Sequence, residues 1–192
     1  PYFVAVGCSV VTGTGIQYDD TWVNRLAEKL NLEHINLGLD GSSLEYQYDK
    51  ILDAEKILTN AKFIIWMQSQ PIRTHRLGLS KVLGDKLARV FLNDQLFRSP
   101  DQLGKLWQKV LKFYDLSKDK NIIYTNTWHW DPRLLLLLEN KICKKDHRWI
   151  VNNFIQCDEG INDPHPGPKT HLLLAEKIHT HINTHFTELQ NK

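Results

Sequence analysis

Short apolar runs alternate with stretches of helical periodicity along most of this chain. Runs rich in apolar and β-branched residues predict strands at residues 2–6, 34–37, 63–67 and 121–124. Apolar residues that recur every three or four positions predict amphipathic helices in residues 22–30, 44–58, 103–114 and 174–189. A weaker fifth strand is expected near residues 149–155, and the irregular stretch of residues 70–100 predicts loops and short helices.

The alternation of predicted strands and helices indicates an α/β domain with a parallel sheet. Parallel neighbours need crossover connections, which are nearly always right-handed and usually helical. Five strands suit a chain of 192 residues, which is the length of one ordinary domain. We therefore expect a single domain over residues 1–192, built on a five-stranded parallel sheet.

Composition and charge argue against several classes of protein. With 42% hydrophobic and 24% charged residues the chain is expected to fold, and a net charge of +2 disfavours a nucleic-acid partner. The longest apolar run, residues 134–138, is too short to cross a membrane, and no signal-peptide pattern opens the sequence. Three cysteines without CxxC spacing indicate neither a disulfide framework nor a zinc site. These features predict a cytoplasmic protein that uses no metal and no cofactor, and they leave its oligomeric state open.

Glycine and polar residues follow the predicted strands at their carboxyl ends, where an open parallel sheet binds its ligands. These sets are Gly7-Cys8-Ser9 after the first strand, Gly41-Ser42-Ser43 after the second, and Gln68-Ser69-Gln70 with Arg73 after the third. The early glycines do not form a P-loop, because five residues separate Gly7 from Gly13. They do not form a dinucleotide fingerprint either, because Tyr18 stands where that motif needs glycine or alanine.

Ser9 is a candidate nucleophile, because a serine on the turn that leaves the first strand is exposed at the edge of the sheet. His165 is the candidate base, since it lies in the proline-bracketed loop of residues 163–167 before the final helix. Asp163 is placed to orient its ring, as the third member of a triad does. The simpler alternatives are that Ser9 only caps a turn or helix, and that the loop only connects two elements.

Three segments together resemble a known family. Residues 7–9, 36–43 and 163–167 resemble blocks one, two and five of the SGNH (GDSL-like) hydrolases, in the same order. The resemblance implies a three-layer α/β/α sandwich related to flavodoxin, with esterase, lipase or carbohydrate deacetylase activity and no metal. It further implies that Ser9 is the nucleophile, that His165 is the base, and that the backbone N–H groups of Ser9 and Gly41 bind the oxyanion.

The chain departs from the family pattern at three points. Cys8 replaces the aspartate of Gly-Asp-Ser, and the Gly-x-Asn-Asp block after the third strand is missing. The amide of Gln68 or Gln70 is the expected substitute for the missing asparagine, with Ser69 between them. The family aspartate usually stands three residues before the histidine, where this chain has Asn162, so either Asn162 or Asp163 orients His165.

The sequence thus predicts a serine esterase that removes a short acyl group, such as acetyl, from a sugar or another small alcohol. The alternative is a binding or structural module that keeps the fold without efficient catalysis. Arg73 either binds an anionic substrate group or lies in a solvated loop. His171 either lines the site or caps a helix, and His181 with His185 is expected on a solvated helix face.

Overall fold

The computed structural model of this chain describes residues 1–55, 61–69, 105, 108, 109, 112, 121–126, 148–150 and 156–186. Its centre is a sheet of five parallel strands, in the spatial order β2-β1-β3-β4-β5. The strands are β1 (Tyr2–Gly7), β2 (Glu33–Gly38), β3 (Ala61–Gln68), β4 (Ile122–Asn126) and β5 (Trp149–Ile150). This is the strand order of flavodoxin-like doubly wound folds, and it confirms the predicted five-stranded parallel sheet.

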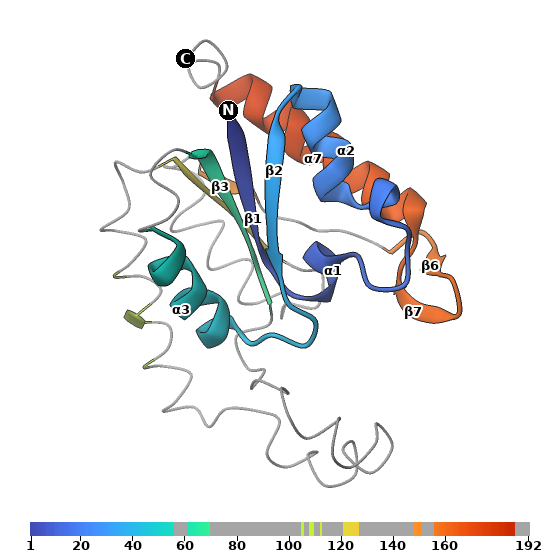
Figure 1. The fold of residues 1–192 in the computed structure, drawn as a ribbon, viewed down its shortest axis with the longest axis horizontal. Coiled ribbons are helices and arrows are strands. Elements are labelled where there is room, and N and C mark those ends of the chain that lie inside the picture. The colour runs from blue at the N-terminus through green and yellow to red at the C-terminus, as the bar shows by residue number, and fades with distance from the viewer. Residues whose placement is uncertain are drawn as a thin grey trace, which may run out of the picture.

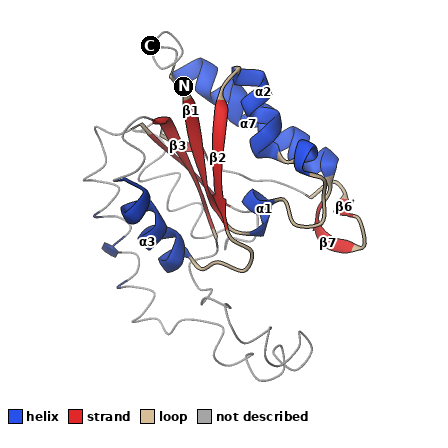
Figure 2. Cartoon of the chain, viewed as in Figure 1, coloured by secondary structure: helices blue, strands red, loops and turns tan. Residues whose placement is uncertain are grey.

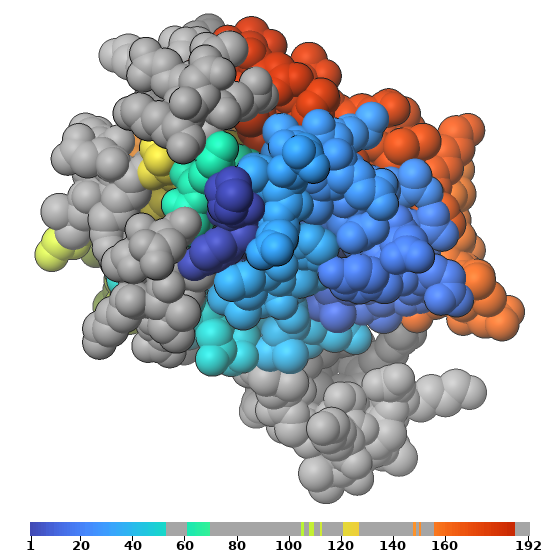
Figure 3. All heavy atoms as spheres, turned by 45° about the horizontal axis from the view of Figure 1, so that its top comes forward, coloured from blue at the N-terminus to red at the C-terminus, as the bar shows by residue number. Residues whose placement is uncertain are grey.

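Helices cover both faces of the sheet, as Figures 1 and 2 show. On one face lie α2 (Trp22–Leu30) and α7 (Pro168–His185), which pack against each other and adjoin in the space-filling view of Figure 3. On the other face lies α3 (Leu44–Glu55). The short helix α1 (Ser9–Thr12) and the 3-10 turn η1 (Tyr18–Asp20) connect β1 to α2. Helical residues on both sides of one sheet give the predicted three-layer arrangement.

The core has two parts, one on each face of the sheet, because successive side chains of a strand point to opposite faces. Phe3 and Ala5 of β1 belong to the apolar cluster that α2 and α7 cover, and Phe63 and Ile65 of β3 join them there. The intervening residues face α3, where Trp66 packs against Tyr48 with ring centroids 6.4 Å apart. The strands β1 and β3 therefore bury both faces, which explains their continuous apolar runs in the sequence.

Two local expectations differ from the structure. Ser9 is not on an exposed turn: it is the first residue of α1 and only 5% exposed, because Val10 and Val11 of the same turn pack into the core. The segment expected as a stiff loop contains a strand, β7 (Asp163–Pro166), which pairs antiparallel with β6 (Glu159–Gly160). Both prolines are tolerated because a two-stranded ribbon demands few backbone donors.

The remaining predicted elements have mixed outcomes. The final helix is confirmed through His185, whereas Phe186, which was expected inside it, follows its end. Residues 105, 108, 109 and 112 are helical as expected. Predictions for residues 56–58, 70–100 and 151–155, for the rest of residues 103–114 and for Leu189 lie outside the described residues. Within the described segments, no helix is long and apolar enough to cross a membrane.

Candidate active site

Buried polar side chains gather at the carboxyl edge of the sheet, where α1 follows β1 and α3 follows β2. All of them are at most 5% exposed: Ser9, Ser42, Ser43, Gln47, Gln68, Ser69, Thr125 and Asn126. Buried polar groups are costly unless they are hydrogen-bonded or serve a function. Their concentration at this edge therefore marks the candidate site.

Ser9 is positioned by the turn that leaves β1. Cys8 precedes α1 in an extended conformation, and its carbonyl accepts hydrogen bonds from the backbone N–H groups of Val11 (2.9 Å) and Thr12 (3.1 Å). The Cys8 side chain is 3% exposed and packs in the apolar cluster. The position that holds aspartate in the family motif thus serves here as part of the core.

The strand β2 holds α1 from the other side. Asn36 Nδ2 donates to the carbonyl of Val11 at 2.7 Å, while Asn36 Oδ1 accepts from the backbone N–H of Gly38 at 2.9 Å. One side chain therefore ties the helix that carries Ser9 to the end of the neighbouring strand.

His165 and Asp163 form a pair on β7. His165 Nδ1 is hydrogen-bonded to Asp163 Oδ1, and the backbone N–H of His165 donates to the same oxygen at 2.8 Å. These two hydrogen bonds, the backbone one first, lower the pKa of Asp163 below its ordinary value. Asn162 lies in the turn before β7 with a left-handed φ of 55°. Of the two candidates left open by the sequence, Asp163 is the residue that contacts the imidazole.

The hairpin β6–β7 packs against the segment that follows Ser9. The helix α1 contacts β7, and the backbone N–H of Ile161 donates to the carbonyl of Gly15 at 2.8 Å. Ser9 and His165 both lie in the described ranges, and no hydrogen bond joins them there. Catalytic hydrogen bonds are often long in the absence of substrate, so the arrangement brings the two elements together without forming the nucleophile–base contact.

Gly41 lies in a tight turn beside the end of β1. The backbone N–H of Ser42 donates to the carbonyl of Leu39 at 3.0 Å, and Gly41 between them has a φ of +70°. A turn with positive φ at its third residue favours glycine. The N–H of Leu39 donates to the carbonyl of Gly7 at 3.0 Å, so the turn is attached to the strand that precedes Ser9.

Gln68 and Ser69 end β3 at the same edge. Gln68 is fully buried and, like Trp66 two residues earlier, belongs to the face that α3 covers. Its register partner on β4 is Asn126, which is also fully buried. The predicted site residues Gln70 and Arg73 lie outside the described residues.

His171 is a capping residue of a neighbouring helix. Its Nδ1 accepts a hydrogen bond from the backbone N–H of Trp22, the first residue of α2, at 3.0 Å. Burial lowers the pKa of His171 to about 4, because nearby Asp158 and Asp20 only partly oppose the desolvation. The ring is therefore neutral at pH 7, and of the two alternatives for His171 the structure supports the cap.

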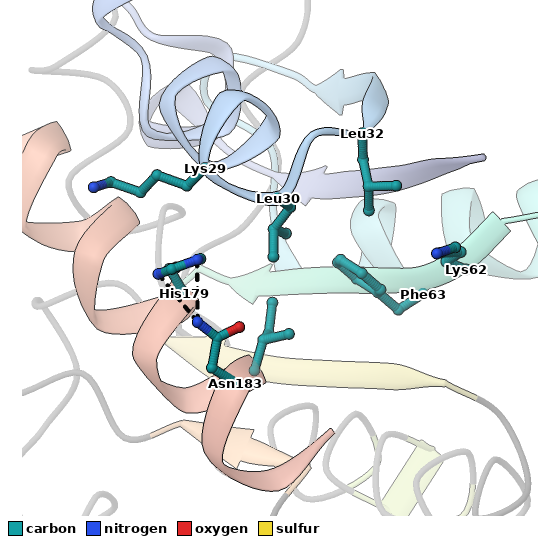
Figure 4. Close-up of a pocket in the computed structure, with 8 residues that line it drawn as sticks. Lys29, Leu30, Leu32, Lys62, Phe63, His179 and Asn183 are labelled. Carbon is teal, nitrogen blue, oxygen red and sulfur yellow. Dashed lines mark hydrogen bonds between the residues drawn. The ribbon is translucent and has the colours of Figure 1, made fainter. Parts of the chain in front are cut away.

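A cavity of about 220 Å³ lies at the opposite edge of the sheet (Figure 4). Leu30, Leu32 and Phe63 line it, with Lys29 and Lys62 beside them. These residues belong to the amino ends of the strands and the end of α2, whereas Ser9 follows the carboxyl end of β1. The cavity is therefore separate from the candidate active site.

Gln47 and Asn126 are two further buried residues of this edge, to which no sequence motif points. Gln47 occupies the buried stripe of α3, three residues after Leu44 and four before Ile51, both of which are fully buried. A polar residue within an apolar stripe was the available signal, because such a side chain must find hydrogen-bond partners in the core. Across the described ranges, no three His, Cys, Asp or Glu side chains are grouped so as to hold a metal ion.

Comparison with solved structures gives matches over most of the chain. A protein assigned to the G-D-S-L family of lipolytic proteins from Desulfitobacterium hafniense DCB-2 has a TM-score of 0.58 at 14% identity, covering 94% of this chain and 98% of its own. The psychrotrophic esterase EstA of Pseudoalteromonas sp. has a TM-score of 0.58 at 13% identity, and the match covers 97% of this chain and 98% of EstA. The acetyl xylan esterase Est2A of Butyrivibrio proteoclasticus has a TM-score of 0.60 at 14% identity, and the match covers 97% of this chain and 64% of Est2A.

No protein-family model and no curated protein matches the sequence. The likeness is therefore one of fold: the chain has the α/β fold of the SGNH (GDSL-like) hydrolases. The fold predicted by the resemblance of the three sequence blocks is confirmed.

Proposed function

We propose that this protein hydrolyses small carboxylic esters through an acyl-enzyme intermediate on Ser9. The observation that carries the proposal is the pair of Asp163 and His165 on a hairpin that contacts the helix beginning at Ser9. The pair has the geometry of a base and its orienting carboxylate, and the fold is one that esterases use. Fold alone does not determine activity, whereas Ser9, His165 and Asp163 would supply the groups that ester hydrolysis needs.

In the proposed reaction, Ser9 Oγ attacks the ester carbonyl carbon while His165 Nε2 accepts the hydroxyl proton. The carboxylate of Asp163 at Nδ1 stabilises the imidazolium that forms. The backbone N–H groups of Ser9 and Gly41, with the amide of Gln68, donate to the oxyanion. The tetrahedral intermediate then expels the alcohol, which takes its proton from His165. Water, activated by the same imidazole, releases the acid and restores Ser9.

The proposed substrate is a short acyl ester of a sugar or another small alcohol. The buried polar residues at this edge of the sheet carry hydroxyl or amide groups, and such groups suit a polar alcohol. The acetyl xylan esterase Est2A shares the fold, which supports an acetylated carbohydrate as the first substrate to examine.

The alternative is a binding module without efficient catalysis. One observation favours it: Ser9 is only 5% exposed and is not hydrogen-bonded to His165 within the described residues. The missing Gly-x-Asn-Asp block points the same way, because an absent oxyanion donor typically lowers the rate by about 100- to 1,000-fold.

The experiment is turnover of p-nitrophenyl acetate, compared with p-nitrophenyl decanoate, by the full chain. We expect activity on the acetate, its loss in Ser9→Ala, and covalent labelling of Ser9 by a fluorophosphonate probe, located by mass spectrometry. Thr12→Val is a matched control, because it removes a hydroxyl from the same short helix without touching the proposed machinery. Labelling that survives in His165→Ala, or turnover that survives in Ser9→Ala, would overturn the mechanism.

A further inference from the structure

A continuous series of hydrogen bonds runs through the side chain of Gln47 in α3. Gln47 Oε1 accepts from Trp66 Nε1 at 3.1 Å and from the backbone N–H of Ser69 at 3.3 Å. Gln47 Nε2 donates to Ser42 Oγ at 3.0 Å, and Ser42 Oγ in turn donates to the carbonyl of Gly7 at 3.0 Å. Every residue whose side chain takes part is at most 1% exposed.

The orientation of this amide follows from its partners. An indole N–H and a backbone N–H can only donate, so the oxygen of the amide must face Trp66 and Ser69. The NH₂ group must then face Ser42, whose hydroxyl accepts from it and is left to donate to the carbonyl of Gly7. Each bond determines the direction of the next, and among side chains of this length only glutamine, or a protonated glutamic acid, supplies both an acceptor and a donor here.

The series connects three segments that meet at the candidate active site. Gly7 is the last residue of β1, two positions before Ser9, and Ser42 follows Gly41 in the turn after β2. Ser69 is the first residue beyond β3, next to Gln68. One buried side chain on α3 thus connects the end of β1, the turn after β2 and the end of β3.

We propose that Gln47 is a positioning residue that sets the Gly41 turn relative to Ser9. The inference rests on the proposed function, because it assigns Gln47 the task of placing the Gly41 N–H where the oxyanion forms. The Ser42 hydroxyl links the two residues, because it accepts from Gln47 Nε2 and donates to the carbonyl of Gly7, which also accepts from the N–H of Leu39. A displaced oxyanion donor weakens transition-state stabilisation without changing the contacts that bind the substrate.

The test compares variants that break different arms of the series. Gln47→Met keeps the length of the side chain and removes every hydrogen bond, whereas Gln47→Glu keeps the acceptor for Trp66 and Ser69 but loses the donor to Ser42 when it is ionised. We expect Gln47→Met and Ser42→Ala each to lower kcat by about tenfold or more with KM within about twofold. The double variant should be no slower than the slower single variant, because both act through one connection.

Two further measurements separate positioning from loss of packing. Ile51→Val removes one buried methylene-sized group from the same helix and should leave kcat unchanged. The activity of Gln47→Glu, divided at each pH by that of the unaltered protein, should rise as the pH falls far enough to protonate the new carboxyl. If loss of packing in α3 explained the lower kcat, Ile51→Val would also lower kcat, and Gln47→Glu would not regain activity at low pH.

Amide hydrogen exchange tests the connection without any use of activity. In Gln47→Met the backbone amides of Ser69 and Ser42 should exchange about tenfold faster or more, whereas amides in the middle of β1 keep their protection. Unchanged exchange at both amides would overturn the connection itself. Faster exchange with unchanged kcat, in a protein whose turnover depends on Ser9, would overturn the positioning role. Absence of any Ser9-dependent turnover would instead overturn the proposed function, and the positioning role with it, while the exchange result would still show the connection.

Discussion

Gly15 and Asp163 are in direct contact, so closely that a Cβ atom at residue 15 would lie 2.9 Å from the Cβ of Asp163. Gly15 also has a φ of +85°, and its carbonyl accepts the hydrogen bond from Ile161 that attaches the hairpin β6–β7. Gly15 is thus needed where the hairpin carrying His165 meets the loop after α1. Its function is to permit this approach.

The Gly15→Ala variant should therefore act on the hairpin. The added methyl group meets Asp163, and the left-handed backbone is strained for alanine, so the hairpin must move away from α1. We expect kcat for p-nitrophenyl acetate to fall by about tenfold or more, with a lower melting temperature. Gly13→Ala is a useful comparison, since its Cβ would meet Thr21 and not the hairpin. Full kcat in Gly15→Ala would show that the hairpin position is not critical.

Replacement of Asp163 tests the orientation of the imidazole. Asp163→Asn keeps an oxygen for the backbone N–H of His165 but removes the negative charge that stabilises the imidazolium. We expect kcat to fall by about 100-fold or more with little change in KM. Asn162→Gly is the matched control: its φ of 55° suits glycine, so activity should persist. Loss of activity only in the Asn162 variant would mean that Asn162, and not Asp163, orients the imidazole of His165.

The order of strands and helices could be predicted from the sequence because strands buried on both faces leave continuous apolar runs. The run at residues 63–67 lies wholly inside β3, and the apolar stripe of residues 22–30 coincides with α2. The N-cap of α2 is equally local, since Thr21 Oγ1 accepts from the N–H of Asn24. Each of these signals is complete within one short stretch of chain.

The polar contacts of the candidate site could not be predicted in this way. The partner of Ser42 is Gly7, which is 35 residues away, and the partner of Gln47 is Trp66, which is 19 residues away. The burial of Ser9 depends likewise on how α1 packs over the sheet. Only the relative placement of elements decides such contacts, so a pattern of residue types can nominate Ser9 and His165 but cannot give the distance between them.

His171 should make the stability of the fold depend on pH. The folded protein holds the ring neutral with a pKa of about 4, whereas the unfolded chain binds a proton below its ordinary pKa of 6.5. The free energy of unfolding should therefore decrease as the pH falls from 6.5 to 4, by at most about 3 kcal/mol, and this contribution should change no further below pH 4. Above pH 6.5 it is fully present.

The variant His171→Gln isolates this contribution. A glutamine can still accept the hydrogen bond from the N–H of Trp22 but does not titrate, so the slope between pH 6.5 and 4 should become smaller. Urea unfolding at several pH values measures the slope. An unchanged slope would mean that other groups dominate acid unfolding.

Asp158 should stabilise the start of α7 from outside that helix. Partial burial raises its pKa, but hydrogen bonds from Thr170 Oγ1 and from the backbone N–H groups of Lys169 and Thr170 lower it below the ordinary value. We expect Asp158→Ala to lower the free energy of unfolding at pH 7 by about 1 kcal/mol, as other lost N-caps do. Because the folded-state pKa is lowered, this stabilisation is present above pH 3.8 and is lost at lower pH. Exposed Glu159→Ala should change the free energy of unfolding far less.

Gln68 provides the last prediction, because it is the described amide that can replace the missing asparagine of the third block. It is buried at the end of β3 on the face that α3 covers, opposite Asn126 of β4. If its N–H binds the oxyanion, Gln68→Ala should lower kcat by about tenfold or more while KM stays nearly constant. Thr125→Val is the control, since it changes a buried hydroxyl on the other face of β4 that has no partner among the described residues.

Loss of kcat in Asn126→Ala but not in Gln68→Ala would move the donor to β4, because the two amides are register neighbours. If both variants lose only thermal stability, the oxyanion must be bound by backbone N–H groups alone, and the binding-module alternative gains support.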